Sequence, residues 1–344
     1  MQTLTITKPD DFHLHLRDGT ALASVVNHTA AQFARAIIMP NLKPPVTTTE
    51  LAYEYHDRIM NSVDEQFGFE PLMTLYLTDN TSAEEIKAAA ESGLIKALKY
   101  YPAGATTNSD QGVTDFKKPV KALEAMMKHG IPLLVHGEVT DSDVDVFDRE
   151  AVFIDKVLTK LVKDFPDLKI VFEHITTKVG VDFVLNSNEN IAATITPQHI
   201  LLNRNELFKS GLRPHNYCLP ILKAEDDRKA VATAAISGDS KFFLGTDSAP
   251  HERKNKETDC GCAGIFSAHI GIELYAEAFD AAGALDKLEP FASFYGADFY
   301  GLPRNNEKIT LIKEALTIPE TIAFADSVLV PFRAGETCAW QLKK

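Results

Sequence analysis

The amino-acid sequence predicts an α/β fold built from parallel strands, and a (β/α)8 barrel of the TIM type is the architecture we expect. Short apolar, β-branched runs recur eight times, and segments with helical periodicity or long loops separate them. The eight units extend from about residue 11 to about residue 280, close to the ~250 residues of a typical barrel. The same alternation also fits a doubly wound sheet, so these observations alone leave both architectures open.

The predicted strands are short and apolar, as strands buried on both faces of a parallel sheet usually are. In chain order they are Phe12–Leu16, Ala36–Met39, Leu72–Leu77, Ile95–Tyr100, Pro132–His136, Lys169–Phe172, Ile191–Thr196 and Lys241–Gly245. The predicted helices between them include Thr49–Asn61, Ser82–Ser92, Lys117–His129, Glu150–Phe165 and Glu225–Ser237. The segment "TSAEE" at 81–85 combines a hydroxyl N-cap with an acidic first turn, which commonly begins a helix.

No linker rich in Pro, Gly or Ser and no shift in composition divides the chain. We therefore expect one domain over residues 1–344, with a barrel core at about 11–280 and a short C-terminal extension at 281–344 packed on it. The extension contains the aromatic segment "FASFYGADFYGLP" and the strand-like segment "SVLV".

The composition is that of a soluble globular protein, with 45% hydrophobic and 24% charged residues. The 35 basic and 48 acidic residues give a net charge of −13, which argues against nucleic acid or an anionic membrane as the main partner. Four irregularly spaced cysteines do not form a disulfide scaffold, and Cys260-Gly-Cys262 alone is a weak metal or redox signal. No apolar run approaches the ~20 residues that span a bilayer, and "MQTLTITKPDD" lacks the features of a signal peptide. We expect a cytoplasmic protein.

Ionisable and polar side chains follow the predicted strands. In "DFHLHLRDG" at 11–19, His13 and His15 alternate with apolar residues and would share one face of a strand. A polar face exposed to water and a pair of metal ligands both fit these nine residues. Other strands also end in single polar residues, namely Asn41, Lys99, His136, His174 and Asp247. In a barrel all these carboxyl ends lie on the face where active sites occur, which favours the metal site.

Four histidines and an aspartate match the ligands of a divalent transition metal such as zinc. Five ligands exceed the three that one catalytic zinc requires, whereas two metals sharing a bridge would use them all. Lys99 is the remaining candidate for the bridge, but a protonated lysine would repel the metals. Unmodified, Lys99 would have to bind phosphate or act as a Schiff-base nucleophile.

Two sequence motifs carry a family resemblance. "DFHLHLRDG" is similar to the pattern Asp-x-His-x-His-x-Arg, and "GTDSAPHERKNK" at 245–256 matches a second signature with Asp247, Ala249-Pro250-His251 and Lys256 in register. With "LKYYPAGATTNS", "LLVHGE", "FEHITT", "TPQHILLNRN" and "YCLPILK", they resemble the amidohydrolase superfamily, and within it the shorter bacterial dihydroorotases (class II). The resemblance extends from about residue 8 to about residue 300.

This resemblance implies a centre of two Zn²⁺ ions per subunit, bridged by a hydroxide and by N6-carboxylated Lys99. Position by position, the implied ligands are His13, His15 and Asp247 for the more buried metal, and His136 and His174 for the other. A carbamate is an anionic oxygen ligand, so the modification would remove the difficulty that a protonated lysine poses.

The implied reaction is the reversible interconversion of N-carbamoyl-L-aspartate and L-dihydroorotate in de novo pyrimidine (UMP) biosynthesis. The bridging hydroxide would attack the ring carbonyl, with Asp247 as general base and then general acid. Arg17 would hold the substrate carboxylate through paired charge-assisted hydrogen bonds. The further substrate contacts implied are Asn41, His251 and the main chain near Leu219 and Ala263.

The segment "AGATTNSDQG" at 103–112 is small and polar, which by itself is typical of a surface loop. The resemblance implies instead a lid that closes over the substrate, with Thr106 and Thr107 touching it. It also implies a homodimer that acts on a small molecule, with no nucleic-acid or membrane partner.

Three other functions compete with this one. A hydantoinase or dihydropyrimidinase would act on substrates without the acidic carboxylate, so Arg17 and His251 favour dihydroorotase. A non-catalytic relative would be expected to lack metal ligands, and a metal-free barrel would use Lys99 as a Schiff-base nucleophile. Glu138 and Glu173 flank ligand histidines, and we expect them at the rim of the core or on the surface, since strand neighbours face opposite ways. His199 is expected to be structural.

Overall fold

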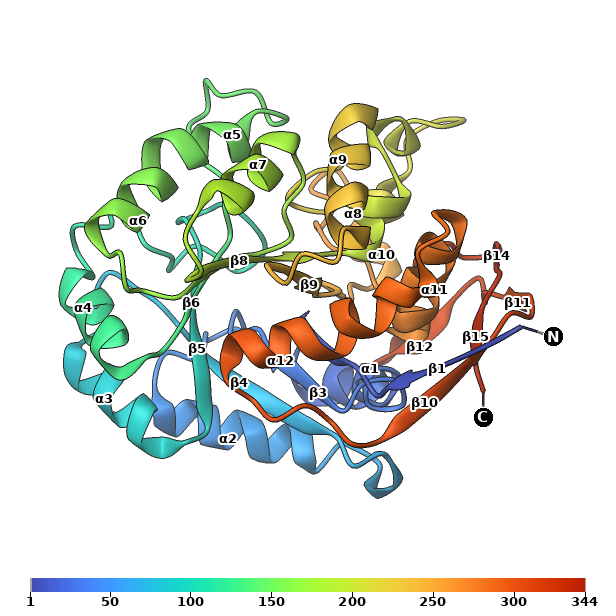
Figure 1. Cartoon of the computed structure of the whole chain (residues 1–344), viewed down its shortest axis with the longest axis horizontal. Coiled ribbons are helices and arrows are strands. Elements are labelled where there is room, and N and C mark those ends of the chain that lie inside the picture. Colours follow the sequence, from blue (N-terminus) through green and yellow to red (C-terminus); the bar gives the residue numbers. More distant parts are fainter. Residues whose placement is uncertain (1, 344) are drawn as a thin grey trace.

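Eight parallel strands form the centre of the computed structural model, which describes residues 2–343. They follow one another in the order β2-β3-β4-β5-β6-β7-β8-β9, so every strand pairs with its neighbour in the chain (Figure 1). The two outer strands meet just beyond their ends: Leu14 and Ser248 form a parallel bridge, and the amide of Asp247 donates to the carbonyl of His13 at 2.9 Å. This closure confirms the barrel and excludes the doubly wound sheet, which has two open edges.

The barrel strands lie close to the segments expected from the sequence. Their bounds are Asp10–Leu14 (β2), Arg35–Ile38 (β3), Glu70–Tyr76 (β4), Ile95–Tyr100 (β5), Leu133–Val135 (β6), Ile170–Phe172 (β7), Ile191–Ile195 (β8) and Phe242–Leu244 (β9). These ends differ from the expected ones by no more than two residues. The agreement follows from the apolar runs, because a strand buried on both faces contains few polar residues.

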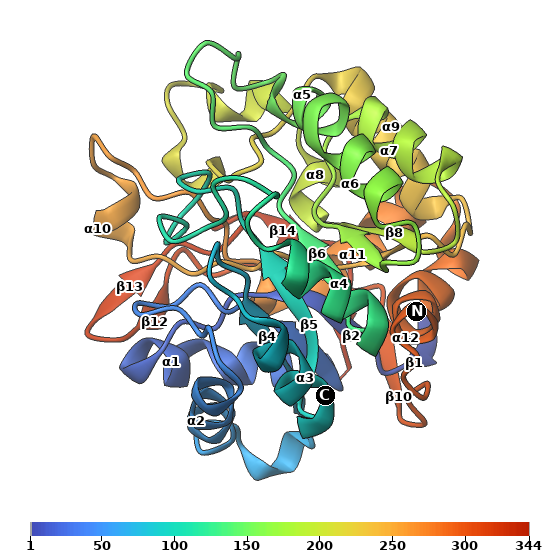
Figure 2. The same cartoon turned by 90° about the vertical axis from the view of Figure 1, so that its left-hand side faces the viewer.

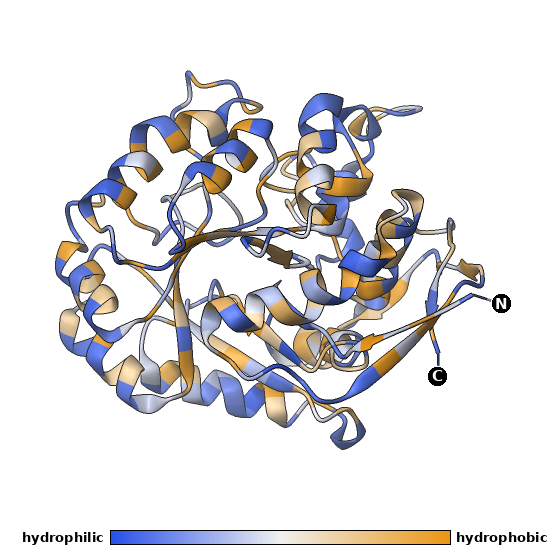
Figure 3. Cartoon of the chain, viewed as in Figure 1, coloured by the Kyte–Doolittle hydropathy of each residue, from blue (hydrophilic) through white to orange (hydrophobic). Residues whose placement is uncertain are grey.

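Helices surround the strands on the outside of the barrel (Figures 1 and 2). They are Gly19–Ala30 (α1), Thr49–Met60 (α2), Ala83–Ser92 (α3), Val120–His129 (α4), Arg149–Phe153 (α5), Thr159–Asp164 (α6), Lys178–Asn186 (α7), Pro197–Leu201 (α8), Glu225–Ile236 (α9) and Gly271–Ala281 (α11). The helix expected at 150–165 is α5 and α6 joined by one π-helical turn, Ile154–Leu158. Ser82 caps α3 by accepting from the amide of Glu85 at 3.1 Å. Hydrophilic and hydrophobic residues alternate around these helices (Figure 3), which is typical of helices with one buried side.

One end of the barrel is sealed by the aromatic segment of the C-terminal part. Helix α12, Tyr295–Tyr300, places the ring of Tyr300 5.1 Å from that of Phe12, inside the barrel. A Cβ on Gly296 would lie 2.2 Å from the Phe12 ring, so glycine is needed for this close approach. Because α12 covers the amino ends of the strands, the opposite, carboxyl end carries the open face.

The two ends of the chain pair with each other beside the barrel. Strand β1, Thr3–Thr7, pairs antiparallel with β10, Lys308–Ile312, which pairs with β15, Gln341–Leu342, at the right of Figure 1. Two short pairs complete this region: Leu316–Thr317 (β11) with Thr337–Cys338 (β14), and Ile322–Phe324 (β12) with Ser327–Leu329 (β13). Among the helices of residues 2–343, none has the length and apolar character that crossing a bilayer requires.

Candidate metal centre

The alternation of side chains along the strands decides which residues enter the barrel. Ala97, Leu134 and Phe243 belong to the apolar layer inside it. Lys99 and His136 lie two residues further along the chain on the same side. These strands therefore direct their last polar residues to the open carboxyl end, as we expected.

Strand β2 reaches the same result through an irregularity. Phe12 lies in the interior layer, whereas Leu14 and Leu16 pack outward against the helices. The pairing of β2 with β3 shifts register between Asp11 and Leu14, and this shift reverses the alternation. His13 and His15 consequently both point into the barrel.

His174 reaches the interior by a turn of the backbone. Phe172 packs outward, so simple alternation would also direct residue 174 outward. The φ of His174 is 42°, in the left-handed region, and its side chain lies among the other histidines. Arg17 (φ 63°) and Asp247 (φ 47°) are also left-handed. Each such non-glycine residue costs about 1–2 kcal/mol, and strain of this kind gathers at functional sites.

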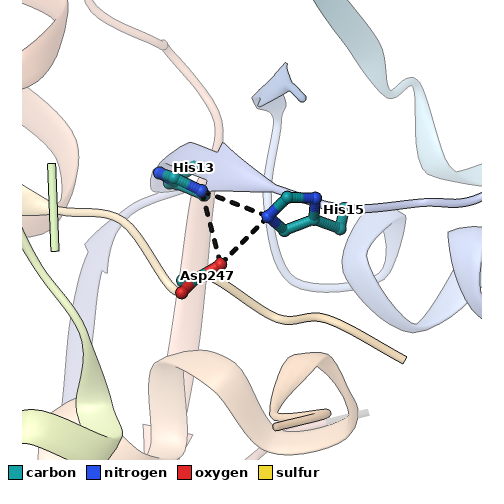
Figure 4. Close-up of side chains that lie close together, drawn as sticks. All are labelled: His13, His15 and Asp247. Atoms are coloured by element: carbon teal, nitrogen blue, oxygen red, sulfur yellow. Dashed lines mark hydrogen bonds and ion pairs between the residues drawn. The ribbon is translucent and has the colours of Figure 1, made fainter. Parts of the chain in front are cut away.

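Figure 4 shows His13, His15 and Asp247 turned toward one another. The Nε2 atoms of the two histidines are 3.3 Å apart, and Asp247 Oδ1 lies 3.3 Å from His13 Nε2 and 3.1 Å from His15 Nε2. Ligands about 2.0–2.1 Å from a tetrahedral zinc are separated by about 3.4 Å. The three atoms are therefore spaced as the ligands of one metal ion would be.

The second ring nitrogen of three histidines faces an oxygen acceptor. Two of these contacts are hydrogen bonds, His15 Nδ1 with Asn41 Oδ1 at 3.0 Å and His136 Nε2 with Glu138 Oε2 at 2.8 Å. His13 Nδ1 lies 3.0 Å from Glu173 Oε1 but is not aligned for a hydrogen bond. A proton on the nitrogen that faces the oxygen leaves the lone pair on the other nitrogen. This is the arrangement that orients histidines as metal ligands.

The ring of His174 lies between those of His13 and His136. Its ring centroid lies 4.9 Å from that of His13 and 4.8 Å from that of His136. Within residues 2–343 its buried Nδ1 has no hydrogen-bond partner, and its amide donates to Thr194 Oγ1 at 2.8 Å. A buried ring nitrogen that has no hydrogen-bond partner is available to bind a metal ion.

Burial keeps these imidazoles neutral, which is the form that binds metals. It lowers the pKa of His15 to about 4, and it lowers the pKa values of His13, His136 and His174 as well. Burial alone would raise the pKa of Asp247, but the adjacent histidines hold it well below its usual range. The centre therefore combines neutral imidazoles with an anionic carboxylate.

Glu173 and Glu138 are buried inside this centre, so the expectation that placed them at the rim or surface is wrong. Glu173 is fully buried and forms an ion pair with Lys99, whose pKa burial lowers well below its usual range. Alternation explains both positions: Glu173 continues the inward register of β7, and Glu138 lies two residues beyond His136 on the same side. Counting in steps of two along each strand would have found them.

An arginine and a further histidine lie beside the cluster of histidines. Arg17 Nε donates to the carbonyl of Pro250 at 2.9 Å, and Arg17 Nη2 lies 2.9 Å from His251 Nε2. His251 Nε2 is also 2.9 Å from the carbonyl of Ala263. Arg17 and His251 are thus held together at the edge of the cavity.

The loop at 103–112 lies against this cavity. Asn41 Nδ2 donates to the carbonyl of Thr107 at 3.0 Å, and Asn108 Nδ2 donates to the carbonyl of Asn41 at 2.9 Å. Thr107 Oγ1 lies 3.4 Å from the Ala263 carbonyl. Asn41, expected only as a substrate contact, therefore also joins His15 to the loop.

The cavity brings together nearly all the site residues expected from the sequence. It is lined by His13, His15, Arg17, Asn41, Tyr101, Thr106, Thr107, His136, His174, Leu219, Asp247, Ala249, Ala263 and Gly264. Lys99 is fully buried, with its Nζ 4.9 Å from the ring centre of the cavity-lining Tyr101, and His251 lies beside Arg17. Tyr101 was not among the expected site residues. It is two residues beyond Lys99 and lies on the same side of the chain.

Two other candidates lie outside the centre. Both ring nitrogens of His199 have partners, Thr196 Oγ1 at 2.7 Å and the Pro220 carbonyl at 2.9 Å, as a structural histidine would. In the part of the chain that the structure describes, the groups able to hold a metal are His13–His15–Asp247 and His13–Glu173–His174. Neither includes Cys260 or Cys262.

Comparisons with known proteins agree with this geometry. The model of the amidohydrolase family matches residues 9–337. A dihydroorotase of Methylobacillus flagellatus is 63% identical over 341 residues, which is 99% of both chains. The structure of dihydroorotase from Campylobacter jejuni is 37% identical with a TM-score of 0.91, over 99% of this chain and 98% of that one. The structure of Saccharomyces cerevisiae dihydroorotase in complex with 5-fluoroorotic acid is 33% identical with a TM-score of 0.92, over 100% of this chain and 99% of that one.

Both the family match and the full-length identity cover the strands, the histidines and the arginine described above. The chain therefore belongs to the amidohydrolase family, among its dihydroorotases.

Proposed function

We propose that this chain interconverts N-carbamoyl-L-aspartate and L-dihydroorotate in pyrimidine biosynthesis. The observation that carries the proposal is a cluster of metal-ligand side chains that shares one cavity with Arg17. A hydrolytic centre beside a carboxylate-binding guanidinium suits a cyclic amide that bears an acid group. The ligand of the yeast relative, 5-fluoroorotic acid, is such a pyrimidine carboxylic acid.

Two Zn²⁺ ions per subunit are the proposed cofactors. His13, His15 and Asp247 would hold one ion, His136 and His174 the other, and N6-carboxylated Lys99 would bridge them. When bound, the metals supply Lewis acidity, which lowers the pKa of a water molecule and polarises a carbonyl. The neutral imidazoles and the unpartnered His174 Nδ1 support this ligand set. Carboxylation would replace the ammonium of Lys99 by an anion, so Glu173 would lose its ion pair with Lys99. Its contact with His13 Nδ1 would remain.

Arg17 is the proposed anchor for the substrate carboxylate. Its hydrogen bond to Pro250 uses Nε, which leaves the Nη1 and Nη2 end of the guanidinium to pair with two carboxylate oxygens. His251 beside it, Asn41, and the main chain of Leu219 and Ala263 would supply the remaining polar contacts.

Asp247 is the proposed general base and acid. In the hydrolytic direction its anionic carboxylate would accept a proton from the attacking water and later deliver it to the departing ring nitrogen. In the cyclisation direction the same carboxylate would take the proton from the carbamoyl nitrogen. Thr106 and Thr107 of the loop would cover the substrate and exclude bulk water.

The first test combines metal analysis with a dihydroorotate hydrolysis assay, with and without chelator. We expect about two zinc ions per chain and turnover that chelation abolishes. Asp247→Asn should retain most of the metal but lose at least about a hundredfold in turnover, since general acid–base catalysis contributes about 10²–10⁴-fold. Asp57→Asn, on the exposed face of α2, is the matched control. Near wild-type turnover by Asp247→Asn with unchanged metal content would contradict the proposed role.

Substrate analogues separate the competing functions. Hydantoin and dihydrouracil lack the acidic carboxylate, so a dihydroorotase should turn them over poorly. Borohydride trapping of Lys99 with a carbonyl substrate would support the Schiff-base alternative, whereas stoichiometric zinc would exclude it. We also propose a cytoplasmic homodimer, for which sedimentation of the purified protein measures the oligomeric state.

A further inference from the structure

Lys256 is a buried lysine that the proposed chemistry does not use. It ends the short helix α10, Arg253–Lys256, and is only 4% exposed. Its Nζ donates to the carbonyls of Tyr217 at 2.9 Å, Cys262 at 3.1 Å and Gly264 at 2.5 Å. An ammonium group has three N–H donors, and all three are occupied. Within residues 2–343 Lys256 makes no ion pair, so main-chain carbonyls alone receive its hydrogen bonds.

These contacts fix the direction of the carbonyl that lies between them. The carbonyls of Cys262 and Gly264 both point at Lys256, whereas that of Ala263 points the other way, into the cavity. There it meets His251 Nε2 at 2.9 Å and Thr107 Oγ1 at 3.4 Å. Lys256 thus holds, from behind, the main-chain group that faces the substrate cavity and the loop above it.

The same ammonium joins a second segment of the cavity wall. The Tyr217 carbonyl accepts both from Lys256 and from the amide of Gly264, at 3.0 Å. Leu219, two residues beyond Tyr217, lines the cavity. On the cavity side, Gly264 packs so closely that a Cβ would lie 2.8 Å from the His251 ring. The segments around Leu219 and Ala263 are consequently held in one fixed relation.

We propose that Lys256 is a positioning residue for substrate recognition, which orients the main chain of Ala263 and Leu219 toward the bound ring. This inference rests on the proposed function. Burial lowers the pKa of Lys256 to about 8, so the ammonium is retained at neutral pH. Because Lys256 contacts none of the metal ligands, its removal should weaken substrate binding without disturbing the metal centre.

The test compares two variants of Lys256 with a buried lysine elsewhere. Lys256→Met shortens the side chain by one atom and removes every donor, whereas Lys256→Gln keeps two N–H groups. Lys8→Met is the matched control, because Lys8 is also buried and donates to a carbonyl, that of Phe67 at 2.9 Å, at the sealed end of the barrel. For each metal-loaded protein, KM and kcat for dihydroorotate, zinc content and Tm are measured at pH 7.

We expect KM of Lys256→Met to rise at least about tenfold, with kcat within about threefold of wild type and zinc content unchanged. The KM of Lys256→Gln should lie between those of wild type and Lys256→Met. Lys8→Met should lower Tm without changing KM. If Lys256→Met does not fold, Lys256→Gln carries the test with the same expected direction. An unchanged KM, or loss of zinc in parallel with activity, would overturn the inference alone. An inactive wild-type protein would overturn the proposed function together with it.

Discussion

Glu150 offers a test of how His174, one of the proposed metal ligands, is held in place. This residue of α5 is buried, and its carboxylate faces Thr176 and Thr177, the second and third residues after His174. Oε2 accepts from the amide of Thr176 at 2.9 Å and from its hydroxyl at 2.6 Å, and Oε1 accepts from the amide of Thr177 at 2.9 Å and from its hydroxyl at 2.6 Å. One carboxylate therefore fixes the turn that directs His174 inward.

Glu150→Gln changes these contacts without changing the size of the side chain. The amide oxygen can keep both bonds to Thr177, and the hydroxyl of Thr176 can rotate to accept from the new NH2 group. The amide of Thr176 then faces another donor at its shorter contact and keeps only its longer bond to Oε1, at 3.2 Å, so this change costs about 1 kcal/mol. Loss of charge from the two remaining bonds adds roughly 1 kcal/mol. Burial raises the pKa of Glu150, so relief of desolvation offsets part of this loss, and we expect a decrease of about 1 kcal/mol in the free energy of unfolding.

Urea unfolding of the metal-free protein measures the stability, and competition with a chelator measures the affinity for zinc. One of two bound ions should be released at a lower chelator concentration in Glu150→Gln, because the position of His174 depends on this turn. Asp10→Asn is the control: Asp10 accepts from Arg35 at 3.0 and 2.6 Å at the sealed end of the barrel. Asp10→Asn should be less stable to urea than wild type but should release zinc at the same chelator concentration. Wild-type stability of Glu150→Gln, or zinc release identical to that of Asp10→Asn, would refute the reasoning.

Three further predictions concern the substrate, the loop and the pH dependence of stability. Arg17→Gln should raise KM for dihydroorotate by about a hundredfold at unchanged zinc content, since a paired charge-assisted contact is worth about 3 kcal/mol; a KM near that of wild type would contradict its role. Replacing Thr106 and Thr107 by alanine should lower kcat without loss of zinc, and unchanged kinetics would refute the lid. Burial raises the pKa of Glu273 from 4.5 to about 7, so the folded state holds this proton more tightly and loses up to about 3 kcal/mol of stability as pH rises from 4.5 through 7. Glu273→Gln should therefore be more stable than wild type at pH 8 but not at pH 4.5 in urea unfolding, and an equal difference at both pH values would contradict this.

Local patterns in the sequence determined the eight strands, their order and the polar residue that ends most of them. A buried parallel strand must be apolar along its whole length, so its position can be found without knowledge of its neighbours. Alternation with a period of two then places Lys99 and His136 on the inner side. The strand pattern and the strand ends were therefore sufficient to predict a parallel sheet with polar residues at its carboxyl edge, whereas the closure of that sheet into a barrel rests on the contact between its first and last strands.

Long-range contacts decided the rest. The inward direction of His174 depends on a left-handed backbone that Glu150 and Thr194 support, and both are distant in the sequence. Asn41 meets both His15, a proposed metal ligand, and the loop, although the family resemblance implied only a contact with substrate.

The ion pair between Glu173 and Lys99 and the sealing of the barrel by α12 are likewise products of packing between remote segments. A sequence pattern states which side of its own element a residue occupies. Only the folded chain determines which groups from other elements it meets there, because those distances are set by the closure of the barrel.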